Sequence, residues 1–350
     1  MAAALTFDEK YAVLGAAGAA YEGQFITAVK TTGVFCRPAC RARKPNRENV
    51  TFFETPQEAL RHGYRPCKLC RPMDPLGAAP PEVQRLMDDL AADPFRRFKD
   101  QDLRDRGVDP ARIRRWFKRH HGMTFQGYQR LLRLNAAYRG LRQGERVTDT
   151  AFDSGYRSLS GFNDSYKSIF GAPPSASAGR AVLTVHRFPT PLGPMIACAS
   201  EAGLCLLDFT DRRRLETGFA ELRKRLVAVI LPGDGPILAQ TRAELAAYFA
   251  GTLRKFTVPL HLPGSDFQQA VWAELQRIPY GATRSYKDQA IALNRPTAIR
   301  AVAAANGQNR VAIIVPCHRV IGADGSMVGY GGGIARKRAL LDLEAGPQFR

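Results

Sequence analysis

A single cysteine near the C-terminus has the neighbours that a nucleophilic thiol needs. The apolar run Val311–Val315 leads through Pro316 into Cys317, which is followed at once by His318 and Arg319. A β-branched run of this length predicts a buried strand, and the proline fixes the backbone where that strand ends. Because the thiolate is the reactive form of cysteine, an adjacent base and an adjacent cation favour nucleophilic chemistry at Cys317. From these residues alone, a buried cysteine that only packs at the end of a strand remains the alternative.

Four other cysteines have the spacing of a metal site. Cys36 and Cys40 form a C-x3-C pair, and Cys67 and Cys70 form a C-x2-C pair. Two thiolates of such a pair can share one ion, and four thiolates complete a tetrahedral zinc site. The chain has seven cysteines, an odd number that favours metal or thiol chemistry in a reducing compartment over a disulfide framework. We therefore predict one Zn²⁺ per chain, bound by these four residues, with a structural role as the default interpretation.

The chain is basic along its whole length. Its 350 residues carry a formal net charge of +19, and the N-terminal, central and C-terminal parts are each positively charged. A polyanionic partner accounts for this pattern better than a single basic targeting segment does. No apolar stretch approaches the roughly 18 residues of a membrane span. Residues 1–10 also lack the basic-then-apolar order of a signal peptide, so we predict a cytoplasmic protein without membrane association.

Segments rich in proline and glycine divide the chain. Residues 73–81 and 171–179 are predicted to be linkers, and a weaker break falls at 262–265. The part between the linkers has helical periodicity, the next part mixes short β-branched runs with a helix, and the last part is helical again. The expected fold is a multidomain α+β architecture with a small zinc-bound α/β domain, an all-α domain, an α/β subdomain and a helical domain. The expected domains are 1–75, 82–172, 181–262 and 265–346.

The segment around Cys317 resembles the O6-alkylguanine-DNA alkyltransferase family, whose hallmark is Pro-Cys-His-Arg-Val. Ordered matches over a long stretch are far more specific than one pentapeptide. The further matches are Ser285-Tyr286, Arg300-Ala301-Val302, Asn309, Gly329-Tyr330 and Leu340–Glu344. The resemblance implies a ribonuclease-H-like subdomain followed by a winged-helix-like catalytic domain. It also implies transfer of a methyl group from O6-methylguanine, or from O4-methylthymine, to Cys317.

The same resemblance implies a role for each matched residue around the thiol. His318 would act through water as a base toward Cys317, and Glu344 would orient its ring. Asn309 would hold the turn that leads into the active-site segment. An S-methyl thioether is a poor electrophile, and nothing in the sequence would regenerate the thiol. The chain is therefore expected to act as a stoichiometric acceptor, and Cys317 to react once.

Three matched residues would handle the DNA. A nucleotide must leave the duplex before guanine O6 can reach a buried thiol. The resemblance assigns Arg300 to the gap that the flipped nucleotide leaves in the base stack. It assigns Tyr286 to the phosphate that must rotate, and Tyr330 to a hydrogen bond near O6. Double-stranded DNA is thus the expected partner.

The two cysteine pairs have sequence surroundings of their own. Residues 31–43 and 64–70 resemble the N-terminal domain of the Ada methylation-response family. In that family the first cysteine of the C-x3-C pair accepts a methyl group from a methylphosphotriester, so the resemblance implies Cys36 as a second acceptor. Methylation would remove one negative charge from the thiolate cluster and so strengthen DNA binding by nearby cations. Those cations would be Arg37, Arg41, Arg43 and Lys44.

The central helical segment resembles AraC-type helix-turn-helix regulators. Residues 147–173 match the second motif of that family, and Lys118 to Met123 match the connector before it. The implied recognition helices are roughly 111–119 and 158–169, with their N-terminal residues facing base edges. The first motif departs from the pattern, because Arg104 follows Leu103 where the family packs a small residue.

All three resemblances occur in the order of the Ada family. They imply a bifunctional DNA repair methyltransferase and transcriptional regulator, a monomer with alkylated and promoter DNA and RNA polymerase as partners; whether the methylated form activates or represses stays open. One alternative is a repair protein whose first two modules only tether it to DNA. A second is a regulator without transfer at Cys317, which the intact set of matched residues disfavours. A thiol hydrolase is a third, disfavoured because no separate histidine pairs with Cys317 in an acyl-transfer pattern.

Overall fold

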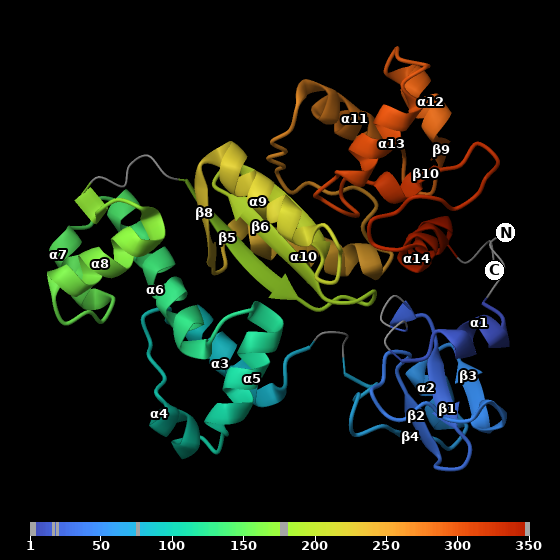
Figure 1. Cartoon of the computed structure of the whole chain (residues 1–350), viewed down its shortest axis with the longest axis horizontal. Helices are drawn as coiled ribbons and strands as arrows, with labels where there is room; N and C mark the ends of the chain where they lie inside the picture. Colours follow the sequence, from blue (N-terminus) through green and yellow to red (C-terminus); the bar gives the residue numbers. More distant parts are fainter. Residues whose placement is uncertain (1–4, 16–17, 19–20, 75–77, 176–180, 347–350) are drawn as a thin grey trace.

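The computed structural model describes most of the chain as a series of regular elements (Figure 1). The described residues exclude 1–4, 16–17, 19–20, 75–77, 176–180 and 347–350. Parts of both predicted linkers, at 75–77 and 176–180, therefore lie outside the described residues. Among the described residues, no helix combines the length and the apolar character that a bilayer span requires.

The N-terminal part is built around a small four-stranded sheet. Its elements are α1 (Phe7–Ala12), β1 (Ile26–Val29), β2 (Val34–Cys36), η2 (Arg47–Asn49), β3 (Val50–Phe53), α2 (Pro56–Arg61) and β4 (Arg65–Pro66). The strand order is β3-β1-β2-β4, with β4 parallel to β2 and the other pairs antiparallel. Its hydrophobic cluster has few fully buried members, namely Ile26, Ala28, Phe35, Phe53 and Ala59. Such a core is too small to stabilise a domain of this size by itself.

The central part is entirely helical. Its helices are α3 (Pro81–Ala92), α4 (Asp100–Asp105), α5 (Pro110–His121), α6 (Phe125–Arg142), α7 (Val147–Asp153) and α8 (Leu159–Phe170). Helices α5 and α8 are present where the recognition helices were predicted. Each ends at a glycine in the left-handed region, Gly122 with φ 69° and Gly171 with φ 73°. The long helix α6 joins the two helix-turn-helix pairs (Figure 1).

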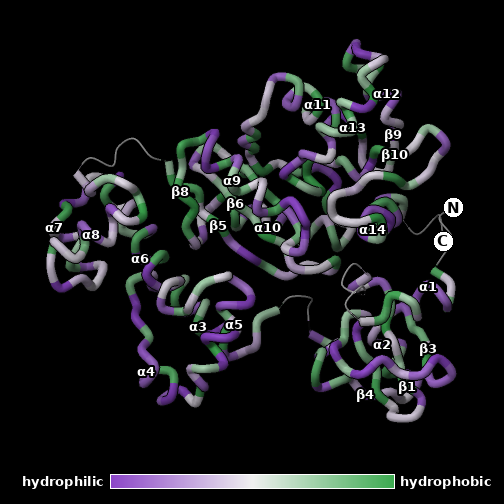
Figure 2. Tube along the Cα trace, viewed as in Figure 1, coloured by the Kyte–Doolittle hydropathy of each residue, from purple (hydrophilic) through white to green (hydrophobic). Residues whose placement is uncertain are grey.

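The C-terminal half combines a sheet with a helical region. Its elements are β5 (Ala181–Phe188), β6 (Met195–Ser200), β7 (Gly203–Phe209), α9 (Leu215–Leu226), β8 (Ala228–Pro232), α10 (Pro236–Phe249), α11 (Asp266–Gln276), β9 (Arg284–Ser285), α12 (Tyr286–Ala292), α13 (Ile299–Gly307), η4 (Cys317–Arg319), β10 (Val320–Ile321) and α14 (Ile334–Ala345). The sheet order is β7-β6-β5-β8, and every residue of β7 is buried. Figure 2 shows hydrophobic residues concentrated along this sheet.

The hydrophobic cores cross the predicted domain boundaries. One cluster joins Phe209 of β7, Tyr248 of α10 and Leu340 of α14, so the sheet and the C-terminal helices are packed together. A second cluster joins helices α6, α7 and α8 to Leu231 of β8. There Asn135 of α6 also donates a hydrogen bond to the carbonyl of Pro232 at 3.1 Å. The helical part therefore packs against the β8 edge of the sheet.

The segment before Cys317 differs from the predicted strand. Its residues are buried, but they form a turn, and only Val311 makes an isolated bridge, to Leu207 of β7. The N–H of Val315 donates to the carbonyl of Val311 at 3.0 Å, and Ile313 has φ 72°. A short apolar run predicts burial correctly but cannot distinguish a buried turn from a buried strand.

Candidate active site and metal centre

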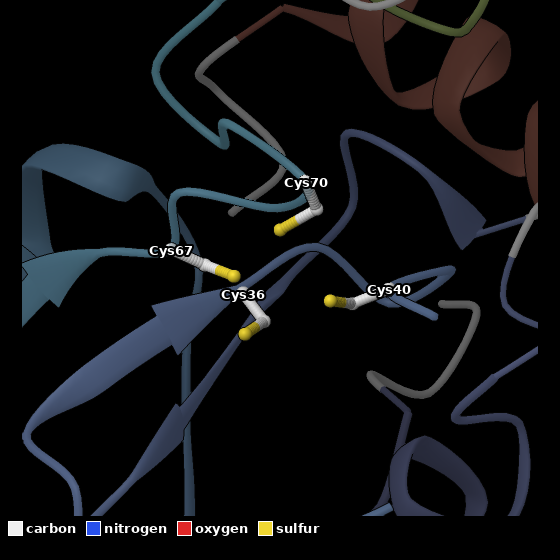
Figure 3. Close-up of side chains that lie close together, drawn as sticks. All are labelled: Cys36, Cys40, Cys67 and Cys70. Carbon is white, nitrogen blue, oxygen red and sulfur yellow. The ribbon is translucent and has the colours of Figure 1, made fainter. Parts of the chain in front are cut away.

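Four sulfur atoms from two separate loops surround one point in the N-terminal part (Figure 3). The Sγ atoms of Cys36, Cys40, Cys67 and Cys70 all lie within 4.8 Å of one another. Cys36 ends β2, while Cys67 follows β4, so the pairing of these two strands brings the cysteine pairs together. All four residues are half-buried. This donor set and spacing fit a tetrahedral tetrathiolate metal site, for which zinc is the usual ion.

The Arg37 side chain is directed toward the loop that carries Cys67 and Cys70. Its guanidinium Nε donates to the carbonyl of Cys70 at 3.0 Å, and its Nη2 donates to the carbonyl of Arg71 at 3.0 Å. It also forms an ion pair with Glu22 at 3.6 Å, and only 12% of the side chain is exposed. The side chain therefore ties the two cysteine loops together, and Arg37 also lines the groove that Arg43 and Lys44 line.

A groove with a basic wall opens beside Cys36. It encloses about 710 Å³, and its lining includes Cys36, Arg43, Lys44 and Arg65. Arg43 and Lys44 were predicted as DNA contacts, whereas Arg65 was not. Arg41 is exposed but does not line the groove. The groove gives a phosphate group both access to the sulfur and cations to hold it.

The second cysteine site is organised by Asn309. Its Nδ2 lies 3.2 Å from the Sγ of Cys317 and donates to the carbonyl of Val315 at 2.8 Å. Its Oδ1 accepts the N–H of Val311 at 2.9 Å. Asn309 thus holds the turn that carries Cys317 and also contacts the thiol. Burial raises the pKa of the Cys317 thiol, and the Asn309 hydrogen bond opposes that rise. The thiol therefore needs a base.

His318 lies next to this thiol and has an unused nitrogen. Its Nε2 is 2.9 Å from Glu344 Oε1, and both side chains are fully buried. Burial lowers the pKa of His318, so the ring is neutral at pH 7. A neutral ring that donates its Nε2 proton to Glu344 leaves Nδ1 as an acceptor. That Nδ1 atom is buried and has no hydrogen-bond partner among the described residues.

Glu344 is fixed by more partners than the sequence suggested. Arg319 donates to it through Nε at 2.8 Å and Nη2 at 2.9 Å, and the Tyr248 hydroxyl donates at 2.8 Å. Burial alone would raise the pKa of Glu344, but hydrogen bonds from His318 and Arg319 hold it at about 2. From the sequence motif, Arg319 was expected to be a cation beside the Cys317 thiol, and its contact with Glu344 was not predicted. No local pattern could have indicated Tyr248.

The predicted DNA-handling residues are split between the site and the surface. The Tyr330 hydroxyl is buried without a partner among the described residues, and burial and nearby Cys317 raise its pKa. Tyr286, at the start of α12, donates to the carbonyl of Gly329 at 3.1 Å, so its hydroxyl lies against the loop that carries Tyr330. Arg300 is exposed on α13. The structure therefore brings the two tyrosines together and leaves Arg300 on the surface.

A buried lysine that the sequence did not indicate supports the same loop. Lys337 Nζ donates to the carbonyl of Val328 at 2.7 Å and to the carbonyl of Val320. Burial lowers the pKa of Lys337 to about 8. Because Val328 lies two residues before Tyr330, this contact fixes the loop relative to the segment that follows Cys317.

Four family models match the chain in sequence order. The metal binding domain of Ada matches residues 9–73, and a helix-turn-helix domain matches 104–180. The ribonuclease-like domain of 6-O-methylguanine DNA methyltransferase matches 184–262, and the DNA binding domain of that enzyme matches 266–346. The fold and the sites thus define a methylated-DNA–protein-cysteine methyltransferase combined with a metal-binding domain and a helix-turn-helix domain.

One relative has this combination over nearly the whole chain. The bifunctional transcriptional activator/DNA repair enzyme Ada of Escherichia coli (strain K12) is 33% identical over 364 residues, covering 98% of each chain. The chain belongs to the Ada family. The methylated-DNA–protein-cysteine methyltransferase of Mycobacterium bovis is 63% identical over 101 residues, which cover 29% of this chain and 61% of that protein. The crystal structure of Mycobacterium tuberculosis OGT in complex with DNA aligns with a TM-score of 0.40 and 44% identity, over 46% of this chain and 92% of that chain.

Proposed function

We propose that this Ada-type repair methyltransferase and transcriptional activator uses two acceptor cysteines. Cys317 takes the methyl group of O6-methylguanine or O4-methylthymine, and Cys36 takes the methyl group of a DNA methylphosphotriester. The observation that supports the first assignment best is the buried Glu344–His318 pair, whose unpartnered Nδ1 belongs to the residue next to Cys317. We also propose the domains 1–75, 82–172, 181–262 and 265–346.

At Cys317 the chemistry is a single displacement. His318 Nδ1 takes the thiol proton through an intervening water, and Asn309 stabilises the thiolate through its N–H. The sulfur attacks the methyl carbon, the carbon–oxygen bond breaks, and its electron pair stays on guanine O6. Tyr330 donates a hydrogen bond to that oxygen. The guanine ring then takes up one proton, and the repaired base is neutral guanine within the DNA strand. The new thioether has no leaving group, so each chain acts once.

At Cys36 no base is required. A bound zinc ion would keep the four sulfurs deprotonated and so supply a ready thiolate. Two of the other sulfurs accept backbone N–H groups, Cys70 from Arg37 at 3.3 Å and Cys40 from Ala42. Such hydrogen bonds make a thiolate less nucleophilic, which disfavours Cys40 and Cys70 as the acceptor. The groove beside it favours a neutral methylphosphotriester, because the net negative cluster repels an ordinary phosphate.

DNA is handled by surfaces on three parts of the chain. At the C-terminal site, exposed Arg300 would fill the gap left by the flipped base, and Tyr286 would contact the rotating phosphate. At the N-terminal site, Arg37, Arg41, Arg43 and Lys44 would hold backbone phosphates. Arg37 would also hold the metal loops together. Helices α5 and α8 would read promoter DNA. We further propose a monomer that contacts RNA polymerase at the promoter.

Mapping of the methylated cysteines tests this function. The zinc-loaded chain is incubated with duplex DNA carrying isotopically labelled methyl groups at guanine O6 and at backbone phosphates, then digested and sequenced by mass spectrometry. We expect label on Cys317 and Cys36 alone. Label on Cys198 or Cys205, or on Cys40, Cys67 or Cys70 in place of Cys36, would contradict the assignment.

Methylation at Cys36 is expected to raise DNA affinity about tenfold at cell-like salt. Loss of one negative charge about 4–8 Å from a phosphate, at an effective dielectric near 20, contributes about 2–4 kcal/mol before screening. Salt reduces this to roughly a tenfold gain and makes the gain larger at low ionic strength. Titration of a promoter fragment with methylated and unmethylated protein, at two salt concentrations, measures the effect.

The same titration also distinguishes a transcriptional regulator from a repair protein that is only tethered to DNA. The control is the Cys317→Ala variant after the same methylation treatment, because its zinc cluster still changes charge while Cys317 cannot be methylated. Equal affinities of methylated and unmethylated wild-type protein would leave a repair protein with a DNA tether, and the switch would be abandoned.

A further inference from the structure

A basic cavity lies in the helical part, away from both acceptor cysteines. It has a volume of about 630 Å³ and forms where the segment before α4, helix α6 and the turn before α8 meet. Its lining includes five basic side chains, which are Arg97, Lys99, Arg130, Arg133 and Arg157. The other described lining residues are Gly155, Tyr156 and Ser165, so no carboxylate is among them. The cavity therefore concentrates positive charge.

These cations lack the counter-ions that neighbouring arginines have. Arg106 pairs with Asp89 at 2.6 Å, and Arg114 pairs with Asp100 at 2.6 Å, in the same helical part. Among the described residues, none of the five cavity cations forms an ion pair with a carboxylate. Like charges gathered in this way repel one another unless an anion joins them.

Arg133 gives the strongest indication of a missing ligand. The residue is only 9% exposed, and its Nε is buried without a hydrogen-bond partner among the described residues. Burial lowers the pKa of Arg133, and the charges of Arg97 and Arg130 lower it further. A buried guanidinium whose Nε–H group has no partner is unfavourable, and buried guanidinium groups are normally paired with an anion.

The remaining groups at the cavity suit an oxyanion. The Tyr156 hydroxyl donates to Ser165 Oγ at 2.8 Å, which leaves the Ser165 proton able to point elsewhere. Arg97 Nη1 donates to the carbonyl of Gly155 at 3.3 Å and so holds the turn before α8 at the cavity. Several guanidinium donors with a hydroxyl are the groups that bind phosphate oxygens in proteins.

We propose that this cavity binds a phosphoryl oxyanion, and that its occupant is a backbone phosphodiester of the duplex held by the two helix-turn-helix motifs. The cations come from both motifs and from the helix between them, since Arg97 precedes α4, Arg130 lies on α6 and Arg157 precedes α8. Arg157 lies two residues before α8, whose N-terminal end is the end proposed to face the bases. The site therefore lies where a strand would pass between the motifs. This inference rests on the proposed promoter binding.

Charge-removing variants of exposed cavity residues test the site. Full-length, zinc-loaded protein methylated at Cys36 is titrated with a duplex recovered by that protein from a random pool, and with an unselected duplex. Arg130→Gln and Arg157→Gln are each expected to weaken binding to the selected duplex about tenfold and to lower its salt slope by roughly one. The control is Arg85→Gln, which removes the same charge from the exposed face of α3 outside the cavity. An equal loss of DNA affinity in Arg85→Gln would overturn the proposed phosphate site.

A substitution of the buried Arg133 provides an independent test through the thermal stability of the protein. Arg133→Met is expected to raise the thermal midpoint of the DNA-free protein, because it removes an unpaired buried charge, while DNA affinity falls at least tenfold. A purely structural Arg133 would instead lower the midpoint, and that result would overturn the assigned role. If Arg133→Met does not fold, the DNA affinities of Arg130→Gln and Arg157→Gln test the proposed site without it. Unchanged methyl transfer to Cys317 confirms that each exposed variant is intact.

Inorganic phosphate distinguishes the two sources of the oxyanion. Phosphate, compared with chloride at the same ionic strength, is expected to compete with DNA in wild-type protein and less so in Arg157→Gln. If phosphate raises the thermal midpoint of wild-type protein while both exposed variants bind DNA normally, the occupant is free phosphate and the phosphodiester assignment fails. If wild-type protein recovers no preferred sequence, the proposed promoter binding fails, and the unselected duplex still tests the cavity through its salt slope.

Discussion

The Cys317→Ala variant is expected to take no methyl group from O6-methylguanine while it still accepts one from a methylphosphotriester. Cys317 supplies the only sulfur that contacts Asn309 among the described residues, and its neighbour His318 carries the unpartnered ring nitrogen. The cysteines of the metal cluster lie in a separate small domain with its own core. Transfer of labelled methyl groups to protein, measured separately for the two DNA lesions, gives the result.

Two further variants make this result specific. Cys198→Ala removes a fully buried cysteine of β6 and is expected to leave both transfers unchanged. Cys36→Ala is expected to show the reciprocal loss, with O6-methylguanine still repaired. Continued clearance of O6-methylguanine by Cys317→Ala would mean that another group is the acceptor.

Local spacing was enough to predict the metal centre and the helices of the central part. The C-x3-C and C-x2-C pairs indicated one cluster, and their sulfurs do lie within 4.8 Å of one another. The predicted helices at 111–119 and 158–169 correspond to α5 and α8 because amphipathic spacing and a terminal glycine are both local signals. The roles of these helices on DNA remain predictions.

Contacts between distant residues could not be predicted in the same way. Arg37 looked like one of several surface cations, and only the fold shows that Glu22 and the carbonyl of Cys70 hold it inward. Tyr248 binds Glu344 from 96 residues away. The basic cavity likewise combines residues from 97 to 165, which come from both helix-turn-helix motifs and the helix between them. Such sites depend on packing, which a linear pattern does not contain.

Removal of the metal ion is expected to unfold residues 1–75 and to leave the rest of the chain folded. The sheet of this part has a small hydrophobic cluster, so metal affinity supplies most of its folding free energy. Structural zinc sites of this kind contribute on the order of 10–16 kcal/mol, far more than such a core can. Chelation of the full-length protein, and the Cys70→Ala variant, are expected to collapse the amide resonances of residues 1–75 to disordered positions.

The hydrogen bonds of Arg37 offer an alternative to the metal ion as the group that holds the two cysteine loops together. Its side chain joins the loop of Cys36 and Cys40 to the carbonyls of Cys70 and Arg71, so it could hold the loops together without an ion. The Arg37→Ala variant is therefore expected to bind one zinc per chain and keep its fold, with weaker metal affinity. Cys205→Ala, a change in the buried strand β7, serves as the control and is expected to retain both the ion and the fold. Well-dispersed amide resonances from a metal-free N-terminal part would show that the loop contacts suffice and that the ion is not what folds it.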